Sequence, residues 1–159
     1  MTNIKISEEE LNDRAKFFSK YILGLAYKYD VRYVESEDQY GIETAFYGCF
    51  CPKCEAYEDF DEGLDGPMCH IEINESLSGN VLELNNTLLH ELVHYKLWYL
   101  GYDYDDEDRQ FKDELKKYHI SSNSDHTYSK TRGKYIEIID KKHLMEYENM
   151  YQKYKNQKA

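Results

Sequence analysis

Two histidines and a glutamate within one short segment have the spacing of a metal site. His90, Glu91 and His94 form the pattern H-E-x-x-H. On an α-helix, residues four positions apart lie about 40° apart on one face, so both imidazoles can bind one ion. Glu91 projects in another direction and can act as general base for a water on the metal. The pattern therefore predicts a zinc ion bound by His90 and His94, with Glu91 as the catalytic residue of a hydrolase.

A catalytic zinc needs a third protein ligand and leaves a fourth position open for water. The acidic segment at residues 103–108 follows soon after Gly101, where the chain can reverse, and one of its carboxylates could reach the ion. These carboxylates could equally cap the next helix and complement its dipole. His119 and His126 lie too far along the chain to be placed by simple geometry.

The four cysteines of the chain provide a second candidate metal site. Cys49, Cys51, Cys54 and Cys69 form C-x-C-x2-C-x14-C, and His70 is adjacent. Tetrahedral zinc accepts four thiolates, or three thiolates and an imidazole. We therefore expect a structural zinc that closes this loop between two strands. Two alternatives stay open, namely ordinary buried thiols and a disulfide from Cys49 or Cys51 to Cys69, which would need an oxidising compartment.

The segment around the two histidines resembles a known family. Residues 86–95 look like the active-site helix of SprT-like zinc metallopeptidases, which are related to the Spartan proteases that cut DNA–protein crosslinks. Residues 101–104, followed by Phe111 and Lys112, are similar to the stretch after that helix. Residues 71–74 resemble the preceding strand, which forms the edge of the substrate cleft. The resemblance covers the order of elements from residue 8 to residue 118, and its specific motifs lie between residues 71 and 112.

The resemblance implies roles for individual residues. His90 and His94 would bind zinc, and Glu91 would be the catalytic acid and base. The family usually has a third histidine shortly before the phenylalanine matched by Phe111; Asp106 aligns best with that position, and His119 is the alternative ligand. The C-terminal zinc ribbon of many family members is missing, because no cysteine follows Cys69. The resemblance to this family therefore implies a peptidase more strongly than a role in DNA repair.

The periodicity of apolar residues predicts an α+β fold. The resemblance to SprT-like enzymes implies a small zincin-like domain in which a short mixed or antiparallel sheet packs on the H-E-x-x-H helix and flanking helices. Asn85 or Asn86 could cap that helix, and Gly101 could end it. The length suits a single domain, residues 1–159, with a cysteine-containing loop at 49–70 and a divergent C-terminal extension at 120–159. The expected helices are residues 8–29, 87–100, 107–118 and 142–155, and the expected strands are residues 31–34, 44–48, 71–74 and 135–139.

The composition bounds the partners of the chain. The formal net charge is −11, which repels phosphate backbones and makes DNA binding unlikely or weak; residues 129–134 are the one short basic segment. The N-terminal residues lack an apolar signal segment, and no apolar run reaches the length of a membrane span. We therefore expect a cytoplasmic protein that acts on a protein or peptide substrate and not at a membrane.

Three functions compete. The first is a zinc-dependent endopeptidase whose extended substrate pairs with the strand at residues 71–74. The second is a catalytically weak or inactive SprT-like module that binds a partner protein. The third is a metal-dependent hydrolase of another bond, such as a nuclease, which the spacing after His94 does not favour. The first is the function that the sequence predicts.

Overall fold

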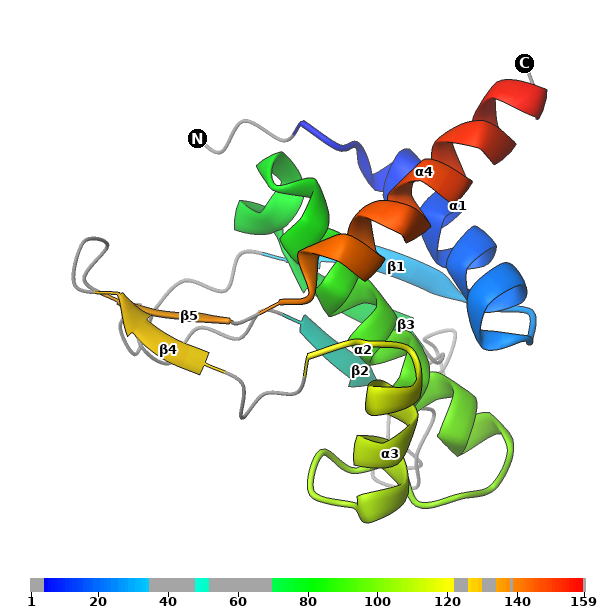
Figure 1. The fold of residues 1–159 in the computed structure, drawn as a ribbon. Helices are drawn as coiled ribbons and strands as arrows, with labels where there is room; N and C mark the ends of the chain where they lie inside the picture. Colours follow the sequence, from blue (N-terminus) through cyan, green and yellow to red (C-terminus); the bar gives the residue numbers. More distant parts are fainter. Residues whose placement is uncertain are drawn as a thin grey trace, which may run out of the picture.

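The computed structural model describes residues 5–34, 48–51, 70–121, 126–129, 134–137 and 139–158. These ranges contain helices and a small mixed sheet, so the predicted α+β class is confirmed (Figure 1). The helices are α1 (Glu8–Phe18), α2 (Val81–Tyr99), α3 (Arg109–Lys117) and α4 (Lys141–Lys158), with a π-helical turn at Ser19–Leu23 and a 3-10 turn at Glu75–Gly79. The strands are β1 (Asp30–Val34), β2 (Gly48–Cys51), β3 (His70–Asn74), β4 (His126–Ser129) and β5 (Lys134–Glu137).

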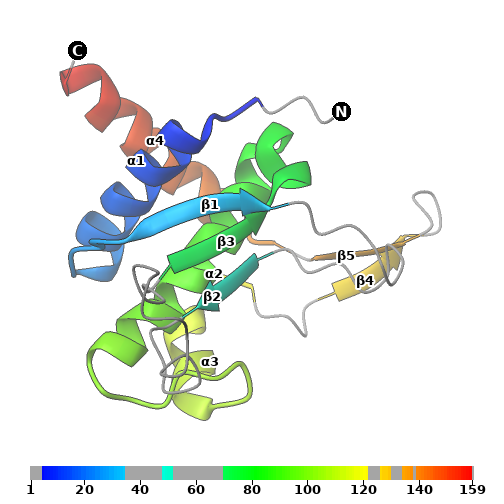
Figure 2. The ribbon, with the colours of Figure 1, turned by 180° about the vertical axis from the view of Figure 1, so that it is seen from behind.

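The main sheet has three strands in the order β1-β3-β2. β1 is parallel to β3, with Val31 opposite Ile71, and β2 is antiparallel to β3, with Phe50 opposite Ile71. One face of this sheet packs against α2, which lies behind it in Figure 2. Ile71 and Ile73 are fully buried because they point to this inner face. β4 and β5 form a separate antiparallel pair.

Helix α2 begins earlier than the sequence analysis predicted. Its N-cap is Asn80, whose Oδ1 accepts a hydrogen bond from Glu83 N at 3.3 Å and whose Nδ2 donates to Glu83 Oε2 at 2.8 Å. This reciprocal arrangement satisfies the first turn of the helix. Asn85 and Asn86, which we expected at the cap, are instead buried inside the helix. The predicted end is confirmed, because Gly101 adopts a left-handed conformation with φ 82°.

The first helix is shorter than predicted, although its start is confirmed. Ser7 accepts a hydrogen bond from Glu10 N at 3.1 Å and caps α1. The helix widens into a π-helical turn after Phe18 and ends before Gly24, whose φ of 86° is left-handed. The predicted continuation to residue 29 is therefore wrong, because the chain reverses at Gly24 and enters β1.

Two further strands differ from the prediction in their position along the chain. Residues 44–47 of the expected second strand lie outside the described residues, and β2 runs from Gly48 to Cys51. Cys49 and Cys51 therefore lie on a strand and not within a loop. The expected strand at 135–139 corresponds to β5, and its partner β4 occupies a segment for which we predicted no strand.

The core brings together the two ends of the chain. Helices α1, α2 and α4 contact one another, with Leu11, Leu88 and Tyr151 fully buried. Arg14 of α1 pairs with Glu148 of α4, and Asn85 of α2 donates to Glu148 Oε1 at 2.9 Å. Burial works to raise the pKa of Glu148, but hydrogen bonds from Arg14, Gln152 and Asn85 outweigh it and lower this pKa. None of the helices in the described ranges is both long and apolar enough to cross a bilayer.

Candidate metal centre

Helix α2 carries the two histidines and the glutamate on its buried surface. The exposed fractions of His90, Glu91 and His94 are 2%, 5% and 8%. Their ligand atoms all lie within 4.8 Å of one another. One helical turn separates the two histidines, so their rings project in nearly the same direction, with centroids 5.1 Å apart.

Asp106 completes the group from the turn between α2 and α3. Its Oδ1 lies 3.1 Å from His90 Nε2 and 2.9 Å from His94 Nε2. In a tetrahedral site with bonds of about 2.0–2.1 Å, two ligand atoms lie about 3.3 Å apart, close to both distances. Hydrogen bonds from His90 and His94 hold the pKa of Asp106 well below its usual range, so the carboxyl is ionised. The N-cap of α3 is Asp108, so Asp106 is not the cap of that helix.

The outer nitrogens of both imidazoles face backbone carbonyls. His90 Nδ1 lies 3.1 Å from Ser121 O, and His94 Nδ1 contacts Tyr104 O. A carbonyl oxygen can only accept a hydrogen bond, so each Nδ1 carries the proton and donates it. In a neutral ring Nε2 then presents a lone pair towards Asp106, whereas in a doubly protonated ring Nε2 donates a hydrogen bond to that carboxylate. Such a hydrogen bond from the distal nitrogen is usual for histidines that bind metals.

The site therefore brings three electron-pair donors to one point. Two Nε2 lone pairs and one carboxylate repel one another unless a cation lies between them or both rings gain a second proton. One cation bound by all three groups removes this repulsion, and the side chains of His90 and His94 that would hold it are only 3% and 10% exposed. The residues present therefore fit a divalent ion bound by nitrogen and oxygen ligands.

Phe111 of α3 holds the imidazoles in position. Its ring stacks on His94 with centroids 3.8 Å apart and an interplanar angle of 10°, and it meets His90 edge-on at 5.0 Å. Phe111 is fully buried, so its own rotamer is constrained by packing. The two rings are therefore oriented by an aromatic side chain as well as by the carbonyls.

Glu91 lies beside the two histidines and beneath β2. Its Oε1 is 4.0 Å from His94 Nε2. A Cβ added at Gly48 would lie 2.7 Å from Thr87 Cγ2 and 3.1 Å from Glu91 Oε2, so glycine permits the close approach of β2 to α2. A pocket of about 200 Å³ opens here between Gly48, Cys49 and Phe50 of β2 and Glu91, His94 and Asp106. The carboxylate and one histidine thus face a cavity that a ligand could enter.

His119, the alternative third ligand, belongs to another group. Its ring stacks on His143 with centroids 3.5 Å apart, and its Nδ1 lies 3.8 Å from Asp140 Oδ2. His143 Nδ1 lies 2.9 Å from the same oxygen. Asp106, and not His119, is the side chain that approaches His90 and His94.

The cysteine site is described in part. Cys49 Sγ and Cys51 Sγ lie 3.7 Å apart on β2, and neither thiol is in a disulfide. The hydrogen bond with Cys51 lowers the pKa of the Cys49 thiol to about 7, so a thiolate forms near neutral pH. Cys54 and Cys69 lie outside the described residues.

The predicted substrate edge is wrong. We expected residues 71–74 to line the cleft and to pair with a substrate, but β3 is the central strand and pairs with β1 on one side and β2 on the other. Its backbone hydrogen bonds are therefore already used. Within the described ranges β2 is the outer strand on the side of the pocket, and Gly48, Cys49 and Phe50 line that pocket.

Three residues of the site escaped the sequence analysis. Ser121 and Tyr104 act through their backbone carbonyls, which every residue type has, so no local sequence signal could identify them. Gly48 carried a detectable signal, because a glycine within a strand often marks a close backbone approach.

Comparisons with models of protein families, with curated proteins and with solved structures found no match for this chain.

Proposed function

We propose that this chain is a zinc-dependent endopeptidase of the SprT-like kind. His90, His94 and Asp106 hold the ion, and Glu91 is the general base. The observation that carries this proposal is the convergence of two Nε2 atoms and one carboxylate, with Asp106 Oδ1 at 3.1 and 2.9 Å from the two nitrogens. The Nδ1 contacts with Ser121 O and Tyr104 O support it, because they leave Nε2 as the metal-binding atom.

Each residue has a distinct task in the hydrolysis of a peptide bond. A zinc ion supplies Lewis acidity, which polarises the scissile carbonyl and makes a water acidic near neutral pH. Glu91 takes a proton from the attacking water and later delivers it to the leaving amine. The burial of Glu91 keeps bulk water from competing for its carboxylate, since only 5% of the residue is exposed.

The pocket and the outer strand support a polypeptide substrate. An extended peptide that pairs with β2, the outer strand of the sheet within the described residues, would pass the pocket between Gly48 and Asp106. Backbone hydrogen bonds position such a substrate without regard to its side chains, so we expect broad specificity. Phe50 and Tyr104, whose rings meet edge-on with centroids 6.1 Å apart, supply apolar surface beside the pocket.

A catalytically weak or inactive binding module is the second candidate. The observation that favours it is the carboxylate of Asp106, which replaces the neutral imidazole expected from the resemblance to SprT-like enzymes. A third ligand with a negative charge lowers the Lewis acidity of the bound ion. The same polypeptide groove would then hold a partner without cutting it.

The test separates metal binding from cleavage. We expect Glu91→Gln to retain zinc and to lose at least about 100-fold in the rate of casein cleavage, since general acid–base catalysis contributes 10²–10⁴-fold. We expect Asp106→Ala to lose the zinc bound by His90 and His94, whereas the control His119→Ala keeps both this zinc and activity. Full activity in Glu91→Gln would refute the mechanism. Zinc binding without cleavage in the unaltered protein would favour the binding module.

A further inference from the structure

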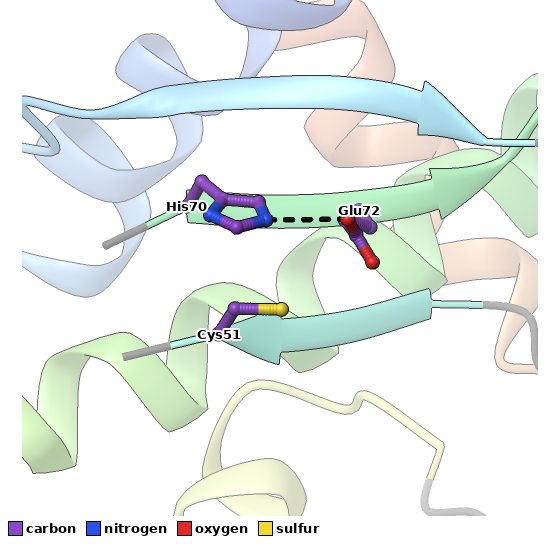
Figure 3. Close-up of side chains that lie close together, drawn as sticks. All are labelled: Cys51, His70 and Glu72. Carbon is purple, nitrogen blue, oxygen red and sulfur yellow. Dashed lines mark hydrogen bonds and ion pairs between the residues drawn. The ribbon is translucent and has the colours of Figure 1, made fainter. Parts of the chain in front are cut away.

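Four side chains with metal-binding atoms share the outer face of the sheet, away from α2. Cys49 lies directly opposite Glu72 and Cys51 directly opposite His70 in the antiparallel register of β2 and β3. Directly opposite residues of a pair project to the same face, and so do residues two apart on one strand. The intervening residue Phe50 projects to the inner face, where its ring lies near the aromatic rings of α2. The strand alternation thus places two thiols, an imidazole and a carboxylate on one face. Figure 3 shows three of these side chains, Cys51, His70 and Glu72.

Three of these side chains have ligand atoms spaced as in a tetrahedral zinc site, and the thiol of the fourth, Cys49, adjoins that of Cys51. The ligand atoms of Cys51, His70 and Glu72 all lie within 4.8 Å of one another. His70 Nε2 is 3.2 Å from Glu72 Oε2, where bonds of about 2.0–2.2 Å imply about 3.4 Å between nitrogen and oxygen. Cys49 Sγ is 3.7 Å from Cys51 Sγ, where zinc–sulfur bonds of about 2.3 Å imply about 3.8 Å.

The neighbouring charges leave Glu72 directed at this group. Arg32 lies opposite Glu72 in the parallel register of β1 and β3, yet its ion pair is with Asp30, at 4.0 Å. The Glu72 carboxylate instead faces His70, and both side chains are partly buried, with 30% and 21% exposure. Two thiols, an imidazole and a carboxylate suit zinc, because thiolates favour a borderline-soft ion over magnesium or calcium.

We propose that Cys49, Cys51, His70 and Glu72 form a second zinc site on the outer face of the sheet. The ion ties β2 to β3 through ligands on both strands, and so fixes the strand that carries Gly48 and Phe50 beside the pocket. Its role is structural, because four protein ligands leave no open position for a substrate. This ligand set differs from the four cysteines expected from the sequence, in that His70 and Glu72 take the places of Cys54 and Cys69.

Cobalt substitution of the full-length, reduced protein tests this site by itself. Cobalt(II) bound by thiolates absorbs in the near ultraviolet through sulfur-to-metal charge transfer, whereas a site of two imidazoles and a carboxylate does not. We expect this absorption in the unaltered protein and in the variant that carries both His90→Ala and His94→Ala. Its absence from the unaltered protein would overturn the proposal. The readout does not depend on Glu91 or on cleavage, so it can fail or succeed independently of the proposed peptidase.

The ligand set is tested by single substitutions with matched cysteine controls. We expect Cys51→Ser to lose most of the absorption, and His70→Ala and Glu72→Ala each to weaken cobalt affinity at least about tenfold. Cys54→Ser and Cys69→Ser should keep the spectrum and the affinity. If these two controls lose the absorption while His70→Ala and Glu72→Ala bind cobalt as the unaltered protein does, the four-cysteine site is correct and the proposal is overturned. Should Cys51→Ser fail to fold, the histidine and glutamate variants still decide.

Discussion

Replacement of Gly48 by alanine tests the contact between β2 and α2 that shapes the pocket. The new methyl group would lie 2.7 Å from Thr87 Cγ2, 3.1 Å from Glu91 Oε2 and 3.2 Å from Glu91 Cγ. Carbon atoms pack best at about 3.5–4.0 Å, so the strand or the side chains must give way by about 0.8 Å or more. Thr87 is β-branched and has few rotamers in a helix, so it cannot turn aside freely. We therefore expect β2 to move away from α2.

The cost follows from this overlap. Overpacking of a buried contact typically destabilises a protein by about 1–3 kcal/mol. For a chain of this size, each kcal/mol lowers the unfolding midpoint by about 2–4 °C, so we expect a fall of about 2–12 °C. Cleavage should fall more steeply, because a displacement of about 1 Å in substrate position can cost about 10²-fold in rate. The ligands of the proposed catalytic ion, His90, His94 and Asp106, lie on α2 and the turn after it, so the zinc content of that site should not change.

Thermal unfolding, zinc analysis and casein cleavage measure these three effects on one preparation. Gly79→Ala is the matched control, because its methyl group would meet only the flexible end of Lys5, at 3.5 Å, and we expect a change within about 0.5 kcal/mol. Thr87→Ser removes the obstructing methyl group, so the variant with both Gly48→Ala and Thr87→Ser should regain stability, with a coupling energy of at least about 0.5 kcal/mol. Equal midpoints for the two alanine variants, without coupling to Thr87, would refute the reasoning.

Two further predictions concern groups outside the pocket. Glu148→Gln leaves Arg14 buried with a weaker partner, and we expect a loss of up to about 3–5 kcal/mol in the free energy of unfolding. Because the pKa of Glu148 is lower in the folded protein, its ionised carboxylate stabilises the fold above the unfolded pKa of about 4.3, and this stabilisation is lost as the pH falls through the folded pKa. The free energy of unfolding of Glu148→Gln should therefore fall less steeply with acid. An unchanged pH dependence would contradict the pairing of Glu148 with Arg14 as its cause. Asn86→Ala removes the acceptor that holds Ser121 N at 3.0 Å, which frees the carbonyl that orients His90. We expect zinc affinity to fall about 10–100-fold in a chelator competition, and an affinity equal to that of the unaltered protein would show that this support is dispensable.

The cysteines show how local prediction fails where strand register decides. From their spacing, Cys49 and Cys51 suggested a metal-binding loop, but they occupy alternate positions of β2 and face His70 and Glu72 across the sheet. No spacing rule could pair them with Glu72, since that contact depends on which residue of β3 lies opposite Cys49. The strand order β1-β3-β2 could not be predicted either, because the pattern at residues 71–74 indicates a strand but not whether that strand is central or at the edge of the sheet.

Helix geometry was enough to predict the part of the candidate site that lies on α2. His90 and His94 are one turn apart on α2, so their common direction follows from helix geometry alone. The end of that helix at Gly101 followed from the conformational freedom of glycine. Both predictions depend on interactions within a few residues of the chain, and such interactions are the same in any fold that keeps the helix.

The groups that complete and orient the site become known only from the packing of separate elements. Asp106 was one of several acidic candidates until the turn after α2 brought its Oδ1 to within 3.1 Å of both histidines. The carbonyl of Ser121, 31 residues after His90, and the close approach of Gly48 depend on how separate elements pack. These contacts join residues far apart in the chain, and their positions result from burial of the whole core, which no short segment encodes.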